Sequence, residues 1–172
     1  MRKTIKAAII PFIVLLFSLV GFAQELGIIH SEAAGGFRYV MPKGWTIAEF
    51  PGMKFKIARG FQADGFTPNI SVFDESFSGS VEDYANANLK QIETIFQNFK
   101  NLGKSVFITN SGLKGIRLAT EATQMGNHLR QTFYFFKGKA GKMLVVTGSV
   151  LAKDGDRFSG LFDASMKTFE VK

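Results

Sequence analysis

The sequence predicts an α+β domain in which helices cover an antiparallel sheet. Several short stretches either alternate apolar and polar residues or are apolar throughout, which is typical of strands. One long stretch, 81–99, has the spacing of an amphipathic helix. The strand-like stretches follow one another without regular intervening helices, which argues against a doubly wound parallel sheet.

The first elements of the domain are predicted to be strands. Residues 37–40 form a strand that stops at 42–44, and an extended segment begins at Trp45, the chain's only tryptophan, which we expect to anchor the edge of the core. Residues 53–58 alternate, with Met53, Phe55 and Ile57 on the buried side. A turn over 64–68 leads into a further strand at 69–73.

The long helix is predicted to run from Val81 to Phe99. Its apolar residues recur at i, i+3, i+4 and i+7. Ser80 is the expected N-cap, the acidic first turn suits the helix dipole, and Lys100 and Gly103 suit the far end.

The second half of the chain is predicted to be strand-rich. Strands are expected at 105–109, 115–123, 129–136 and 142–151, with a hairpin turn at 137–141. Residues 133–136 and 144–146 are apolar on both faces, which predicts central strands covered from two sides. A shorter helix is expected at 156–167, followed by a terminal strand at 168–171.

Residues 1–23 are predicted to be an export signal. A basic start precedes an apolar run, and the small residues Gly21 and Ala23 predict cleavage between Ala23 and Gln24. The run is interrupted by Pro11 and is short for the ~20 residues that cross a bilayer, and the chain has no cysteine for a lipid anchor at the cut. We therefore expect a soluble periplasmic or secreted protein with an irregular lead-in at 24–36 and one domain at 37–172.

The composition of the exported part limits its partners and its core. Removal of residues 1–23 from the 172-residue chain leaves 149 residues with 18 basic and 14 acidic side chains, a net charge too mild to indicate nucleic-acid binding. Of the 19 phenylalanines, 16 remain. They predict a core packed with aromatic rings or, alternatively, an aromatic pocket for an apolar ligand.

The order of elements resembles the PsbP-like superfamily, which also takes in the DcrB-like envelope proteins and the Mog-type Ran-binding proteins. The stretches that carry the likeness are 37–45, 68–72, 80–84, 113–115 and 162–169. The resemblance implies an α/β/α sandwich whose antiparallel sheet is flanked by one long and one short helix. It implies no reaction, because members of the superfamily act as binding or assembly factors, and the photosystem role of PsbP itself is not carried over.

The sequence predicts no catalytic, cofactor-binding or metal-binding residues. There is no cysteine, and His30 and His128 are too far apart in the chain to indicate a pair. The glycines around Ser149 and Lys142 have the wrong spacing for a nucleophile elbow or a phosphate loop. Residues 154–156 are expected to form a turn and helix cap rather than a calcium loop. Asp74 and Glu75 are expected to be solvated.

A non-catalytic accessory protein that binds an unidentified envelope protein is therefore the predicted function. The alternatives are a carrier of a small apolar ligand and, with less support, a hydrolase with scattered carboxylates.

Three lysines are the candidate binding residues: Lys137, Lys139 and Lys142, at the predicted hairpin tip. A second basic group, Lys54, Lys56 and Arg59, is expected on the outward side of another strand. Both groups could simply be solvated surface, or they could dock on anionic membrane headgroups or an acidic partner.

Overall fold

The structure is a computed structural model that describes residues 25–172. The predicted signal segment and its cleavage site at Ala23 and Gln24 lie outside the described residues. No helix in the described range is long and apolar enough to cross a membrane.

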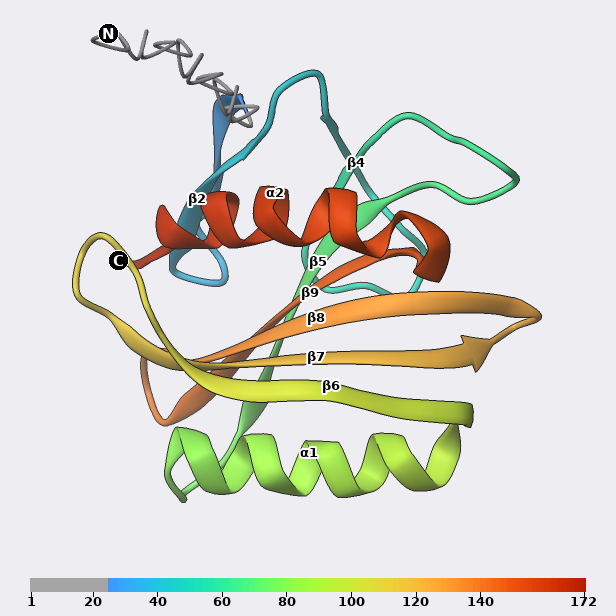
Figure 1. Ribbon diagram of the computed structural model, residues 1–172. Helices are drawn as coiled ribbons and strands as arrows, with labels where there is room; N and C mark the ends of the chain where they lie inside the picture. The colour runs from blue at the N-terminus through green and yellow to red at the C-terminus, as the bar shows by residue number, and fades with distance from the viewer. Residues whose placement is uncertain (1–24) are drawn as a thin grey trace, which may run out of the picture.

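The larger of the sheets is antiparallel throughout and forms the middle layer of the molecule (Figure 1). Its neighbouring strands in residues 25–172 are, in spatial order, β3 (Thr46–Ala48), β4 (Ile57–Arg59), β5 (Asn69–Ser76), β9 (Lys142–Leu151), β8 (Asn127–Lys137), β7 (Lys114–Gln124) and β6 (Gln97–Ile108). A small antiparallel sheet contains β1 (Leu26–Glu32), β2 (Phe37–Pro42) and β10 (Glu170–Val171).

The two faces of the large sheet are covered differently (Figure 1). Helix α1 (Val81–Ile95) covers one face, and α2 (Gly155–Lys167), which follows a short 3₁₀ turn at Ala152–Asp154, packs on the other face together with β2. This arrangement confirms the expected α+β class and the helix on either side of an antiparallel sheet.

Residues 133–136 show why the central strands are apolar on both faces. Phe133 and Phe135 pack in the α1-side cluster with Tyr84 and Ile92. Tyr134 and Phe136 alternate with them and pack in the α2-side cluster. The predicted two-sided burial is therefore confirmed.

Helix α1 begins as predicted and ends earlier than predicted. Ser80 Oγ accepts a hydrogen bond from the Asp83 backbone N–H at 3.0 Å. In turn, the Asp83 carboxylate accepts one from the Ser80 backbone N–H at 3.3 Å, which completes a capping box. The predicted end at Phe99 is wrong, because Phe96 is already extended and Gln97 pairs with Thr123 of β7. Phe96, at the helix C-cap, and Phe99, in β6, still pack on the α1-side cluster, so the apolar spacing continues past the helix.

The expected irregular lead-in at 24–36 also differs in the structure. Residues 26–32 form β1, which pairs with β2 at His30 opposite Tyr39 and Glu32 opposite Phe37. Most β1 side chains are exposed, so no alternating pattern marks the strand in the sequence. The small residues 33–36 form the turn that joins the two strands.

Candidate functional site

The candidate lysines lie where the sequence placed them, around the hairpin that joins β8 to β9. The Lys142 backbone N–H donates to the Lys139 carbonyl at 3.0 Å, and Ala140 and Gly141 have φ of 50° and 72°. Positive φ at both central residues is the geometry of a type I′ turn, which matches the twist of the flanking strands. The predicted hairpin is confirmed.

The hairpin divides the lysines between the two sides of the sheet. Lys137 is paired with Met143, which belongs to the α1-side cluster. Lys142 is two residues before Leu144, which belongs to the α2-side cluster, so Lys142 lies on that other side. The side chain of Lys139 lies beside Gly36, because a Cβ added to Gly36 would be 3.8 Å from Lys139 Cδ. Lys139 and Lys142 are thus brought together, and Lys137 is separated from them.

Lys139 and Lys142 line a surface hollow of about 630 Å³, here called the Lys139 hollow. Its other walls are residues 31–37, which comprise the end of β1, the turn 33–36 and the start of β2, together with Lys54, Asp74, Ala140, Leu144 and Lys172. The Lys172 backbone N–H donates to the Gly36 carbonyl at 2.7 Å, which ties the C-terminal strand to the turn. The hollow therefore combines segments from both sheets.

The charges around the Lys139 hollow are incompletely paired. Lys54 Nζ donates to both oxygens of Asp74, at 2.8 and 2.7 Å. Among residues 25–172, neither Lys139 nor Lys142 has an ion-pair partner. Each ammonium group carries three donors, so the pair can hold a carboxylate or another anion at the mouth of the hollow.

Asp74 and Glu75 have specific partners rather than being merely solvated. Besides the Lys54–Asp74 pair, Glu75 accepts a hydrogen bond from the Tyr84 hydroxyl at 2.5 Å. Burial, together with this hydrogen bond, raises the pKa of Tyr84. These contacts join β5 to a neighbouring loop and to α1, so they stabilise the fold.

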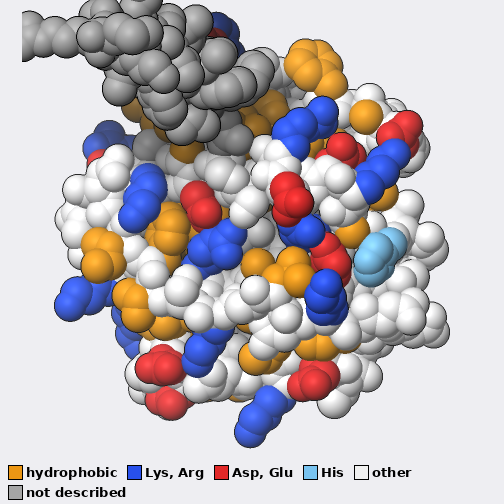
Figure 2. All heavy atoms as spheres, in the orientation of Figure 1, with side chains coloured by type: hydrophobic (Ala, Val, Ile, Leu, Met, Phe, Trp, Pro, Cys, Tyr) orange, Lys and Arg blue, Asp and Glu red, His pale blue; other side chains and the backbone are white. Residues whose placement is uncertain are grey.

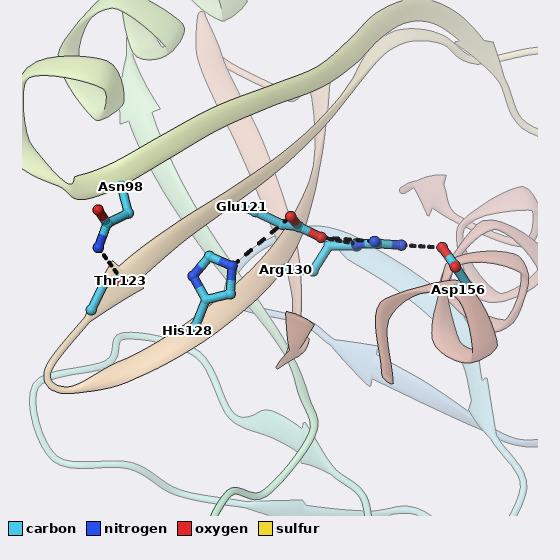
Figure 3. A network of polar contacts seen from close by, with 6 residues as sticks. All are labelled: Asn98, Glu121, Thr123, His128, Arg130 and Asp156. Atoms are coloured by element: carbon cyan, nitrogen blue, oxygen red, sulfur yellow. Dashed lines mark hydrogen bonds and ion pairs between the residues drawn. The ribbon is translucent and has the colours of Figure 1, made fainter. Parts of the chain in front are cut away.

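The histidines do not form a site. His30 is buried in β1, whereas His128 lies near the start of β8 with half its side chain exposed, so they belong to different sheets. Near His128, Glu121 accepts two hydrogen bonds from Arg130, at 2.9 and 2.7 Å, and Arg130 also pairs with Asp156 of α2 (Figure 3). The hydrogen bond to Asp156 is the largest factor that raises the pKa of Arg130. This network links the sheet to the start of α2.

A second network fastens the middle of α2 to the sheet, and sequence reasoning missed it. Asp163 accepts from Arg117 Nε at 2.7 Å and from the Tyr134 hydroxyl at 2.5 Å, and Arg117 also donates to Ser159 at 2.9 Å. The polar residues come from three separate elements, so no local motif reveals them. Since Arg117 and Tyr134 both hold Asp163, this carboxylate has a structural role.

The described residues contain no cluster suited to holding a metal ion: within 25–172, no three His, Asp or Glu side chains come together for this purpose. Glu121, the acidic residue beside His128, is already bound to Arg130 (Figure 3). The Lys139 hollow is lined by the exposed Lys139 and the half-buried Lys142, neither of which has an ion-pair partner within residues 25–172.

The fold is similar to those of solved PsbP and Mog1p structures, in agreement with the resemblance that the sequence implied. No known family model matches the chain, and no curated protein matches it in sequence. Among solved structures, it is similar to a cyanobacterial PsbP (CyanoP) of Synechocystis, with a TM-score of 0.62, 17% identity, and coverage of 91% of this chain and 99% of that one.

Two further solved structures support the same fold. The Ran-binding protein Mog1p of Saccharomyces cerevisiae matches with a TM-score of 0.60 and 9% identity, over 87% of this chain and 96% of that one. LpqN of Mycobacterium tuberculosis, described as involved in cell envelope biogenesis, matches with a TM-score of 0.62 and 10% identity, over 79% of this chain and 83% of that one. At these identities the likeness establishes the fold alone.

Proposed function

We propose that this protein is an exported, non-catalytic accessory protein of the cell envelope that binds another envelope protein. The observation that carries the proposal is the pair Lys139 and Lys142 at the Lys139 hollow, neither of which has an ion-pair partner within residues 25–172. An acidic side chain of a partner would complete the charge pairing that the described residues leave open.

The polar networks give three of the carboxylates structural rather than catalytic roles. Glu121 and Asp156 are joined through Arg130, and Asp163 is held by Arg117 and Tyr134. A hydrolase needs a carboxylate free to take or give a proton at a reacting group. These carboxylates instead link α2 to the sheet.

The neighbours in structure use this scaffold in binding and envelope roles. Mog1p is described as a Ran-binding protein and LpqN as involved in cell envelope biogenesis. A predicted export signal at 1–23 would place the present chain outside the cytoplasm, where an accessory protein of the envelope would act.

The carrier alternative has less support because the aromatic side chains pack on one another. The rings of Phe136 and Phe169 stack with centroids 4.8 Å apart, and those of Phe107 and Tyr134 meet edge to face at 4.9 Å. Rings packed in this way fill the space that an apolar ligand between sheet and helix would need.

The test is a cross-linked pull-down from envelope extract. The bait is the exported form of the full chain, and it is compared with a Lys139→Glu, Lys142→Glu double variant. The control is Lys137→Glu, Lys100→Glu, which changes the net charge equally but lies outside the hollow. We expect one protein to be captured by wild type and control and to be depleted about tenfold with the hollow variant. Capture of no envelope protein by the wild type would contradict the proposal.

A further inference from the structure

The Lys139 hollow is one end of a row of three adjoining hollows in the described residues, which we call the 49–56 groove. The second hollow, of about 490 Å³, shares Glu32 and Lys54 with the Lys139 hollow. The third, of about 160 Å³, shares Phe50 and Met53 with the second. Because each hollow shares walls with the next, the groove follows the loop 49–56 from the small-sheet side toward the opposite side of β4 and β5.

The two ends of the groove differ in chemistry. The Lys139 end presents the ammonium groups of Lys139 and Lys142, which lack partners within the described chain. The far end is apolar: Phe50 is 56% exposed, and it lies with Met53 over buried Ile57. Phe73, on the same face of β5 as Ser71, is 38% exposed. Exposed rings grouped beside a hollow are typical of a surface that a partner covers.

The charged residues in the middle of the groove determine where an acidic group of a bound segment can lie. Lys54 is held by Asp74, and Lys56 pairs with Glu49 at 3.4 Å. Glu32, at the junction of the first two hollows, has no ion-pair partner in the described range. Glu32 lines both hollows. In the middle hollow the other charges are paired, so Glu32 repels an acidic group there. In the Lys139 hollow Lys139 and Lys142 outnumber Glu32, so an acidic group is attracted at that end.

From this gradient we infer that the 49–56 groove binds an extended peptide segment of the partner, with an acidic residue at the Lys139 end and a large apolar residue at the Phe50 end. The inference rests on the proposed function and names the part of the partner that is recognised. The hollows are partly open to solvent, so they suit a chain that keeps one side in water. An acyl chain would require a pocket that encloses most of its surface.

A peptide selection on the protein itself tests the inference. The exported form of the full chain is immobilised and offered a phage-displayed library of random peptides of about 12 residues, long enough to span the three hollows when extended. We expect the enriched sequences to combine Asp or Glu near one end with Phe, Leu, Met or Trp several residues away.

Two variants and one control then locate the bound peptide. An enriched, fluorescently labelled peptide should lose about tenfold or more in affinity with Lys139→Glu, Lys142→Glu, and a similar amount with Phe50→Ala, Met53→Ala. It should bind the Lys137→Glu, Lys100→Glu control within about twofold of wild type. Circular dichroism of each variant confirms that the fold is retained.

Three outcomes would overturn the inference. One is the absence of an enriched acidic and apolar pattern, and another is equal loss of binding with the control. The third is binding to vesicles of phosphatidylcholine and phosphatidylglycerol that the hollow variant abolishes while no peptide is enriched, which would assign the lysines to lipid headgroups. If the pull-down still captures a partner in any of these cases, the assignment of the 49–56 groove as a peptide-binding site is wrong, whereas the proposed function stands.

Discussion

His30 shows at the scale of one residue what the sequence could not reveal. The residue is 7% exposed, and its Nε2 and the hydroxyl of Tyr39 are both buried without a hydrogen-bond partner among residues 25–172. The two rings meet edge to face with centroids 5.4 Å apart. Burial lowers the pKa of His30 below its ordinary value of 6.5; nearby Glu32 opposes this effect and Lys56 adds to it.

We therefore predict that His30 makes the protein less stable in mild acid. The unfolded chain binds a proton on this imidazole at a higher pH than the folded protein does, so the free energy of unfolding falls as the pH drops below about 6.5. In His30→Leu this contribution is absent, and the variant should gain stability relative to wild type between neutral pH and about pH 5. Urea unfolding at both pH values measures the change.

The comparison for this measurement is His128→Leu, which removes an imidazole whose side chain is 51% exposed. A stability difference between His30→Leu and wild type that stays constant with pH would contradict the prediction.

Trp45 illustrates the opposite case, a residue whose place the sequence did predict. It is 9% exposed and packs against Phe158 and Phe162 of α2, with ring centroids 6.3 and 6.2 Å away. A large aromatic residue beside a turn has few places to lie except the core edge. The separation of Lys137 from Lys139 and Lys142 was not predictable in the same way, because it depends on the hairpin register.

At the scale of elements, the contact of α2 with β9 depends on a glycine. A Cβ added to Gly148 would lie 2.7 Å from two atoms of the Phe162 ring, which is almost fully buried. Gly160, on the exposed side of α2, has no such role. Substitution by alanine should therefore change the free energy of unfolding in opposite directions at the two positions.

We predict that Gly148→Ala destabilises the protein by about 1–3 kcal/mol, because Phe162 must move in a packed core. Gly160→Ala should stabilise it by about 0.5–1 kcal/mol, because alanine loses less backbone freedom in a helix. Denaturant unfolding of both variants measures these free energies. A Gly148→Ala protein as stable as wild type would show that α2 does not pack closely on β9.

The elements that the sequence predicted best are those with a periodic buried face. Helix α2 and the strands from β7 to β9 repeat their apolar residues and lie near the predicted positions. Helix α1 was predicted to extend too far because Phe96 and Phe99 keep the helical spacing, although the helix ends before Phe96 and β6 begins at Gln97. Strand β1 was missed because its stability comes from pairing with β2, which leaves no local pattern.

At the scale of the whole molecule, charge is mixed rather than concentrated. The face shown in Figure 2 has basic, acidic and apolar side chains interspersed. Ion pairs such as Arg38–Glu170 and Lys104–Glu82 hold part of this charge. An interspersed surface favours local docking at an uncompensated pair such as Lys139 and Lys142 over long-range attraction to a polyanion. The sequence predicted the mild net charge, but only the fold shows which cations lack partners.

The start of the described chain bears on the predicted export of the protein. Lys43 donates its backbone N–H to the Glu25 carbonyl at 3.0 Å, and the side chains of these residues also pair. Strand β1 begins at Leu26. Cleavage between Ala23 and Gln24 would therefore keep every contact of β1, whereas cleavage a few residues later would remove Glu25.

We predict that the exported product begins at Gln24, because signal cleavage requires small residues at positions such as Gly21 and Ala23. Replacement of Ala23 by Leu should block cleavage, and the uncut chain should then accumulate with residues 1–23 attached. Ala34→Leu, in the exposed turn between β1 and β2, makes the same change outside the signal and should leave processing intact. Intact mass measurement of the exported protein distinguishes these products. Wild-type protein that leaves the cytoplasm with residues 1–23 still attached would contradict the prediction and indicate that the segment acts as an anchor.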